Sequence, residues 1–214
     1  MQITKFTFNG FQENTFVLYD ETGECVIVDP GCYERHEEKE LSGFISANDL
    51  KPKVLLNTHF HLDHIFGNKY VFETYGLKPT ACRLDLPTLA MTAQSAQLYG
   101  FSNYRTSPEP EHFIDEGDVL TFGNSKLNIY FTPGHAPGHI IAVSHKTKDV
   151  IAGDVLFNGS IGRTDLPGGN FGDLEQSIQK KLYTLPDDFT VYCGHGPETT
   201  IGKEKQSNPF VTAV

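Results

Sequence analysis

The sequence has no tryptophan, few cysteines and no long apolar run. Its four cysteines stand far apart with no Cys-x-x-Cys pair, which argues against both a disulfide framework and a zinc ribbon. No apolar stretch approaches the roughly 20 residues that a membrane-spanning helix needs. Residues 1–10 alternate polar and apolar types and lack the basic and then apolar segments of a signal peptide. We therefore expect a cytoplasmic protein that does not contact a membrane.

Basic residues are also scarce. The chain has 17 Lys and Arg against 27 Asp and Glu, a formal net charge of −10, and no Lys/Arg-rich run. Nucleic-acid binders need a basic surface to meet the phosphates, so we expect no nucleic-acid partner. A length of 214 residues with 38% hydrophobic residues suffices for one substantial core, and no linker-like composition interrupts the chain. The sequence predicts a single domain over 1–214.

Apolar periodicity predicts alternating strands and helices. The predicted helices cover 34–47, 84–98 and 172–183, and the predicted strands cover 3–8, 15–19, 24–29, 54–56, 126–131, 140–144, 150–152 and 190–193. Strands 54–56 and 190–193 each run into a histidine, which is the pattern of a duplicated half-sheet with metal ligands at matching strand ends. These elements indicate an α/β fold.

The strongest chemical signal is the segment Thr-His-Phe-His-Leu-Asp-His at 58–64. In an extended chain His59 and His61 lie on one side, and a following turn can bring Asp63 and His64 to a second centre. Two histidines in a His-x-His pattern are usually ordinary strand residues. Three imidazoles and a carboxylate together are costly to bury without a cation, so this segment predicts a metal site.

Three later residues are candidates for the remaining ligands. His135 follows a strand in a Thr-Pro-Gly-His turn, and Asp154 and His195 each follow a glycine at the end of an apolar strand. Taken singly, each is an ordinary loop histidine or turn-forming aspartate. In combination with segment 58–64 they indicate a larger metal-binding set.

The chain resembles the metallo-β-lactamase superfamily, and within it the glyoxalase II-like hydrolases. The resemblance covers nearly the whole length and is carried by Asp29-Pro30-Gly31, THFHLDH at 58–64, TPGHAPGH at 132–139, GDVLF at 153–157, SIGRTDLPGG at 160–169 and CGHGPET at 193–199. It implies an αββα four-layer sandwich of the α/β class, with two mixed sheets, helices outside and the metals at one edge.

The resemblance also implies two divalent metal ions. One ion would be held by His59, His61 and His135, the other by Asp63, His64 and His195, and Asp154 would bridge both. We expect zinc, with iron or manganese as alternatives, since no thiolate ligand selects among them. The implied reaction is attack of a hydroxide shared by the two ions on the carbonyl of a small-molecule thioester, such as S-lactoylglutathione, with Asp63 also accepting a proton.

Several alternatives stay open at this point. The segment around Arg163 also resembles persulfide dioxygenases, which bind one iron, here through His59, His135 and Asp154. Lactone or other ester hydrolysis shares the His-x-His-x-Asp-His pattern, and the metals of a binding module would only stabilise the fold. Full-length glyoxalase II proteins add a basic C-terminal region that binds glutathione, whereas 214 − 195 = 19 residues follow His195 here. Arg163 either contacts an anionic substrate or pairs with Asp165 to fix its loop.

Overall fold

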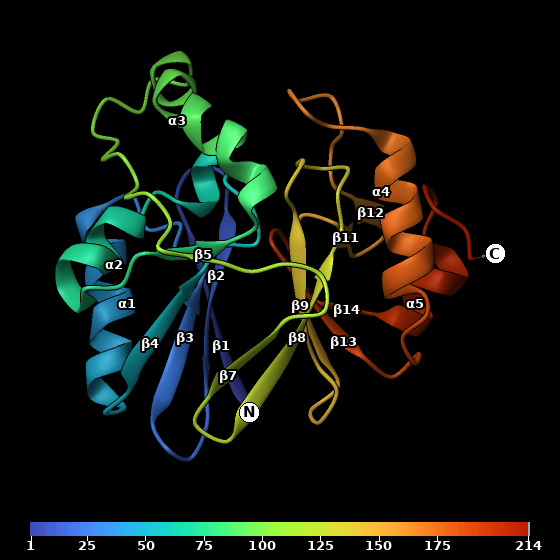
Figure 1. Cartoon of the computed structure of the whole chain (residues 1–214), viewed down its shortest axis with the longest axis horizontal. Helices are drawn as coiled ribbons and strands as arrows, with labels where there is room; N and C mark the ends of the chain where they lie inside the picture. Colours follow the sequence, from blue (N-terminus) through green and yellow to red (C-terminus); the bar gives the residue numbers. More distant parts are fainter. Residues whose placement is uncertain (214) are drawn as a thin grey trace.

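Two six-stranded sheets face each other in the computed structural model, which describes residues 1–213 (Figure 1). In spatial order the first sheet contains β1 (Gln2–Phe8), β2 (Glu13–Tyr19), β3 (Glu24–Val28), β4 (Lys51–Leu56), β5 (Pro79–Ala81) and β6 (His112–Phe113). The second contains β14 (Thr199–Thr200), β13 (Thr190–Cys193), β10 (Asp149–Gly153), β9 (Ile140–Ser144), β8 (Ser125–Phe131) and β7 (Val119–Phe122). A small hairpin pairs β11 (Leu156–Phe157) with β12 (Ser160–Ile161).

Helices cover the outer faces of both sheets. Figure 1 shows α1 (Arg35–Ala47) and α2 (Asn68–Tyr75) beside the first sheet, and α4 (Phe171–Ser177) and α5 (Ile201–Ser207) beside the second. The remaining helix, α3 (Leu86–Leu98), lies above one end of the first sheet. The arrangement is the predicted αββα four-layer sandwich, and this prediction is confirmed.

Apolar residues fill all three spaces between the four layers. Between the sheets, Phe16 and Val28 pack with Leu127, Ile129 and other side chains of β8, β9 and β10. Separate clusters lie between the first sheet and α1, and between the second sheet and α4. Both faces of β2 are therefore buried, whereas β8 buries alternate residues.

Each sheet contains parallel strands whose ends approach the same region. β3 pairs with β4 in one sheet, and β10 pairs with β13 in the other. The chain leaves β4 toward His59, β10 toward Asp154 and β13 toward His195, while the loop between β8 and β9 contains His135. In open sheets the carboxyl ends of parallel strands are the usual place for ligands, and the candidate residues lie at such ends here.

Most predicted elements are present. The predicted helix at 84–98 begins later, at Leu86, because a 3-10 turn, η2 (Arg83–Asp85), precedes it. The predicted helix at 172–183 is α4 followed by a π-helical turn, η3 (Ile178–Leu182). Two helices, α2 and α5, were not predicted because their apolar faces are short.

In the part of the chain that the structure describes, no helix has both the length and the apolar character needed to cross a bilayer.

Candidate metal centre

The segment after β4 is held in place by Asp29, the first residue of the Asp-Pro-Gly turn. Its Oδ1 accepts a hydrogen bond from the Thr58 amide at 2.8 Å, and its Oδ2 accepts one from Thr58 Oγ1 at 2.6 Å. Asp85 holds the next turn by accepting from the Phe60 amide at 2.5 Å. The segment then enters a 3-10 turn, η1 (Leu62–His64). These bonds fix the directions of the neighbouring histidines without relying on a sheet ladder.

Three imidazoles form the first ligand group. His61 Nδ1 lies 2.8 Å from His135 Nε2, which lies 3.2 Å from His59 Nε2. His59 and His135 are buried, whereas His61 is half-buried and lines the cavity described below. Burial and the neighbouring imidazole of His135 lower the pKa of His61 to about 3. The three rings are therefore neutral at physiological pH, which is the form that binds a metal ion.

Asp63, His64 and His195 form the second ligand group. Asp63 Oδ2 lies 3.2 Å from His195 Nε2 and 3.7 Å from His64 Nε2. Burial opposes protonation of His64, but the carboxylates of Asp154 and Asp63 outweigh it and raise the pKa of His64 well above its usual value. This group therefore favours a positive charge at its centre.

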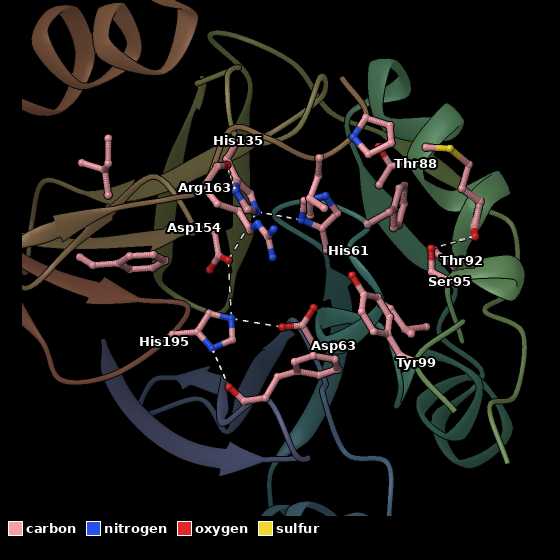
Figure 2. A pocket seen from close by; sticks show the side chains of 18 of the residues that line it. His61, Asp63, Thr88, Thr92, Ser95, Tyr99, His135, Asp154, Arg163 and His195 are labelled. Carbon is pink, nitrogen blue, oxygen red and sulfur yellow. Dashed lines mark hydrogen bonds and ion pairs between the residues drawn. The ribbon is translucent and has the colours of Figure 1, made fainter. Parts of the chain in front are cut away.

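Asp154 lies between the two groups (Figure 2). Its Oδ1 is 3.4 Å from His64 Nε2, and its Oδ2 is 3.4 Å from His135 Nε2 and 3.5 Å from His195 Nε2. The structure thus brings together all seven residues that the resemblance assigned to the metal site, with Asp154 between the two groups.

Two features show that the residues fit a pair of metal ions. Among the described residues, His64 Nε2 and Asp154 Oδ1 are buried polar atoms with no hydrogen-bond partner. Such atoms are rare unless an ion or water completes them. The backbone at Gly194 leaves room there, since a Cβ at this position would lie 2.2 Å from Asp154 Oδ1. Imidazole and carboxylate donors suit zinc, iron and manganese alike, so the donor set does not select the metal.

In four of the five ligand histidines the second ring nitrogen has a partner of its own, as is usual for metal-binding histidines. These pairs are His59 Nδ1 with Thr58 Oγ1 at 3.0 Å, His64 Nδ1 with Asp29 Oδ2 at 3.2 Å, His135 Nδ1 with the Arg163 carbonyl at 2.7 Å, and His195 Nδ1 with the Phe11 carbonyl at 3.1 Å. Sequence reasoning missed one neighbour. Glu13, fully buried at the start of β2, places Oε1 3.9 Å from His64 Nδ1.

His139 and Arg163 lie beside the ligand groups without belonging to them. His139 Nε2 accepts a hydrogen bond from the Asp154 amide at 3.1 Å, and its ring stacks on His59 with centroids 4.8 Å apart. It therefore supports the site and also packs in the core. Arg163 forms a two-point ion pair with Asp165, through bonds of 2.7 and 2.8 Å, and lines the cavity beside the ligands.

A cavity of about 430 Å³ opens onto the ligand groups. Besides the ligands His61, Asp63, His135, Asp154 and His195, its lining includes one face of α3, the β11–β12 hairpin and the loop around Leu166. Phe11 and Tyr99 also line this cavity. Phe101 does not line it and packs against Phe11, with ring centroids 5.4 Å apart.

Comparison with known proteins places this site in a family. Residues 8–195 match the model of the metallo-β-lactamase superfamily. The hydroxyacylglutathione hydrolase GloC of Haemophilus influenzae is 37% identical over 214 residues, which are 100% of this chain and 99% of that protein.

Two solved structures are also similar. The crystal structure of the BLEG-1 B3 metallo-β-lactamase has a TM-score of 0.90 at 34% identity, covering 99% of this chain and 100% of that one. TTHA1623 in a di-iron-bound form has a TM-score of 0.87 at 33% identity, covering 97% of this chain and 100% of that one. The fold, the two ligand groups and these likenesses agree, and the chain belongs to the metallo-β-lactamase superfamily.

Proposed function

We propose that this metallo-hydrolase is a glyoxalase II-like thioester hydrolase that works with two divalent metal ions. The observation that carries the proposal is the position of Asp154 between two ligand groups that border one cavity. Support for the thioester comes from GloC, a relative named for hydrolysis of hydroxyacylglutathione. Zinc is the metal we propose first, although TTHA1623 was solved with two iron ions.

Bound divalent ions lower the pKa of a coordinated water from about 15.7 to about 7 and polarise a carbonyl group. The protein's part is to place the ligands and to manage protons. In the reaction, a water oxygen bonds to the carbonyl carbon, the C–S bond breaks with its electron pair going to sulfur, and the products are a carboxylate, a thiol and one released proton. Because a thiolate leaves readily, the reaction does not require a strong general acid.

We propose that Asp63 accepts the proton that the attacking water loses. Its carboxylate lines the cavity and lies 3.2 Å from His195 Nε2. Burial favours the neutral acid, but His64 and His195 outweigh this effect and lower the pKa of Asp63. The carboxylate therefore remains charged at neutral pH and can accept a proton for a moment before passing it to solvent.

The ligand set favours hydrolysis over the persulfide dioxygenase reaction. That alternative needs His59, His135 and Asp154 alone, and it assigns no ligand role to the second group of Asp63, His64 and His195. His64 Nε2 is buried with no hydrogen-bond partner and faces the carboxylates of Asp154 and Asp63 at 3.4 and 3.7 Å, an arrangement that supports an ion at the second group too.

The test is hydrolysis of S-lactoylglutathione by protein reconstituted separately with zinc, iron and manganese. We expect turnover with at least one metal and loss of at least about a thousandfold in a His61→Ala variant, because that change removes a ligand. Persulfide-dependent oxygen uptake by the iron form, without hydrolysis of any thioester, would overturn the proposal. Hydrolysis of nitrocefin or of a lactone, without hydrolysis of any thioester, would show that the substrate is an amide or another ester.

A further inference from the structure

One wall of the cavity is built by a single face of α3. Thr88, Met91, Thr92 and Ser95 line it at spacings of three and four residues, and Tyr99 follows just after the helix. Figure 2 shows the labelled residues of this group on the side of the cavity away from Asp154 and His195. A substrate arm that extends from the ligand groups toward this side of the cavity would meet α3.

The hydroxyl groups of Thr88, Thr92 and Ser95 on this wall already donate hydrogen bonds within the protein. Thr88 Oγ1 donates to Asp85 Oδ1 at 2.9 Å, Thr92 Oγ1 donates to the Leu89 carbonyl at 2.7 Å, and Ser95 Oγ donates to the Met91 carbonyl at 3.1 Å. A hydroxyl has one proton to donate. A carboxylate placed here would thus find methyl groups and oxygen lone pairs, and no free donor from these three side chains.

The cavity also offers no free cation outside the ligand groups. Among the described lining residues, Arg163 is the only lysine or arginine, and both oxygens of Asp165 bind its guanidinium. The other lining residues include the apolar side chains of Phe157, Ile161, Leu166 and Pro167. The Tyr99 and Ser160 hydroxyls also line the cavity and can donate a hydrogen bond, but neither is a cation. An anionic substrate arm would therefore lose water without gaining a charged partner, which is unfavourable, whereas an apolar arm gains contact with the apolar lining.

We propose that the substrate arm lying against α3 is uncharged and largely apolar. The inference rests on the proposed thioester hydrolysis and adds to it the class of substrate. It applies to the acyl group or to the thiol group, whichever extends toward α3. A glutathione thioester is then turned over through its reacting carbonyl, and the charged ends of the glutathione add little to binding.

The test compares probes that differ only in charge. For the thiol arm, the pair is the butanoyl thioesters of 3-mercaptopropionamide and 3-mercaptopropionate. For the acyl arm, the pair is the N-acetylcysteamine thioesters of adipic acid monoamide and adipic acid. Thiol release gives kcat/KM for the metal-loaded protein. We expect kcat/KM for the amide to exceed that for the carboxylate by about tenfold or more in at least one pair. The pair that shows this difference tells whether the thiol arm or the acyl arm lies against α3.

Two lysine variants test whether the α3 wall causes the preference for the amide over the carboxylate. Ser95→Lys adds a cation to the wall and is expected to lower the amide-to-carboxylate ratio about fivefold or more in the sensitive pair. Gln94→Lys adds the same charge on an exposed position of the helix that does not line the cavity, and it should leave the ratio unchanged. Thermal unfolding of both variants checks that each is folded.

The outcomes separate the two proposals. Equal or faster turnover of the carboxylates in both pairs overturns the inference while thioester hydrolysis stands. An equal effect of both lysines also overturns it, since the charge would then act at long range and not through the wall. If neither these probes nor S-lactoylglutathione is hydrolysed with any metal, the proposed function itself fails, and the inference fails with it.

Discussion

Replacing Gly194 by alanine should weaken metal binding at the second ligand group while leaving most of the fold intact. The added Cβ would lie 2.2 Å from Asp154 Oδ1 and 2.9 Å from His64 Cε1. Ordinary contact begins near 3.4 Å, so Asp154 would have to move by about 3.4 − 2.2 = 1.2 Å. Metal–ligand distances tolerate shifts of only about 0.2 Å, so the ligand groups cannot absorb this movement.

The backbone cannot move away instead, because it is bonded on both sides. The Gly194 amide donates to the Gly153 carbonyl at 2.7 Å, and the Gly194 carbonyl accepts from the Asn14 amide at 2.7 Å. We therefore expect metal affinity and kcat each to fall by about a hundredfold. Stability of the apo-protein should fall by about 1–3 kcal/mol, the usual cost of overpacking.

The assay is metal content by mass spectrometry after dialysis against graded chelator, together with kcat for a thioester. Gly43→Ala is the matched control, because a Cβ there meets no atom within 4 Å. It lies within α1, so it should keep both metals and gain about 0.5–1 kcal/mol of stability. Two tightly held metals and normal kcat in Gly194→Ala would refute the argument from steric contact.

Three further predictions concern the hydrogen-bond partner of His64, the removal of metal and the pH dependence of stability. Asp29→Asn weakens the support of His64 and should lower metal affinity by about 10–100-fold in chelator competition. Removal of metal should lower the unfolding temperature measured by calorimetry, because bound metal stabilises the native state; an unchanged temperature would contradict ion binding at both ligand groups. Burial opposes the charge of Asp20, but hydrogen bonds from Thr22, Ser125 and Asn124 lower its pKa to about 2. Since the unfolded value is about 3.9, this carboxylate stabilises the fold above pH ~4 and loses the effect as pH falls through about 2. Urea unfolding of Asp20→Asn should thus show a loss of about 1–2 kcal/mol at pH 7 that shrinks toward pH 2.

The sequence alone was sufficient to predict those features whose residues lie close together along the chain. The segment from His59 to His64 combines strand periodicity with a density of donors that only a cation explains well. The main strands and α1, α3 and α4 were also predictable, since their apolar positions repeat along the chain. The exact start of α3 was not, because the turn at η2 depends on contacts of Asp85 with distant backbone groups such as the Phe60 amide.

Tertiary structure decided what lies around the ligands. His135, Asp154 and His195 were linked to the first motif by family resemblance, and they meet it only because the two sheets place their strand ends at one edge. Glu13 resembles a surface residue in sequence, yet both faces of β2 are covered and the side chain is fully buried beside His64. Likewise, the Thr and Ser hydroxyls of α3 cannot donate to a substrate because each already donates its proton to a group within the protein, and only the folded structure shows this. Local pattern determines which residues can do chemistry, whereas burial and hydrogen-bond partners arise only when distant segments pack together.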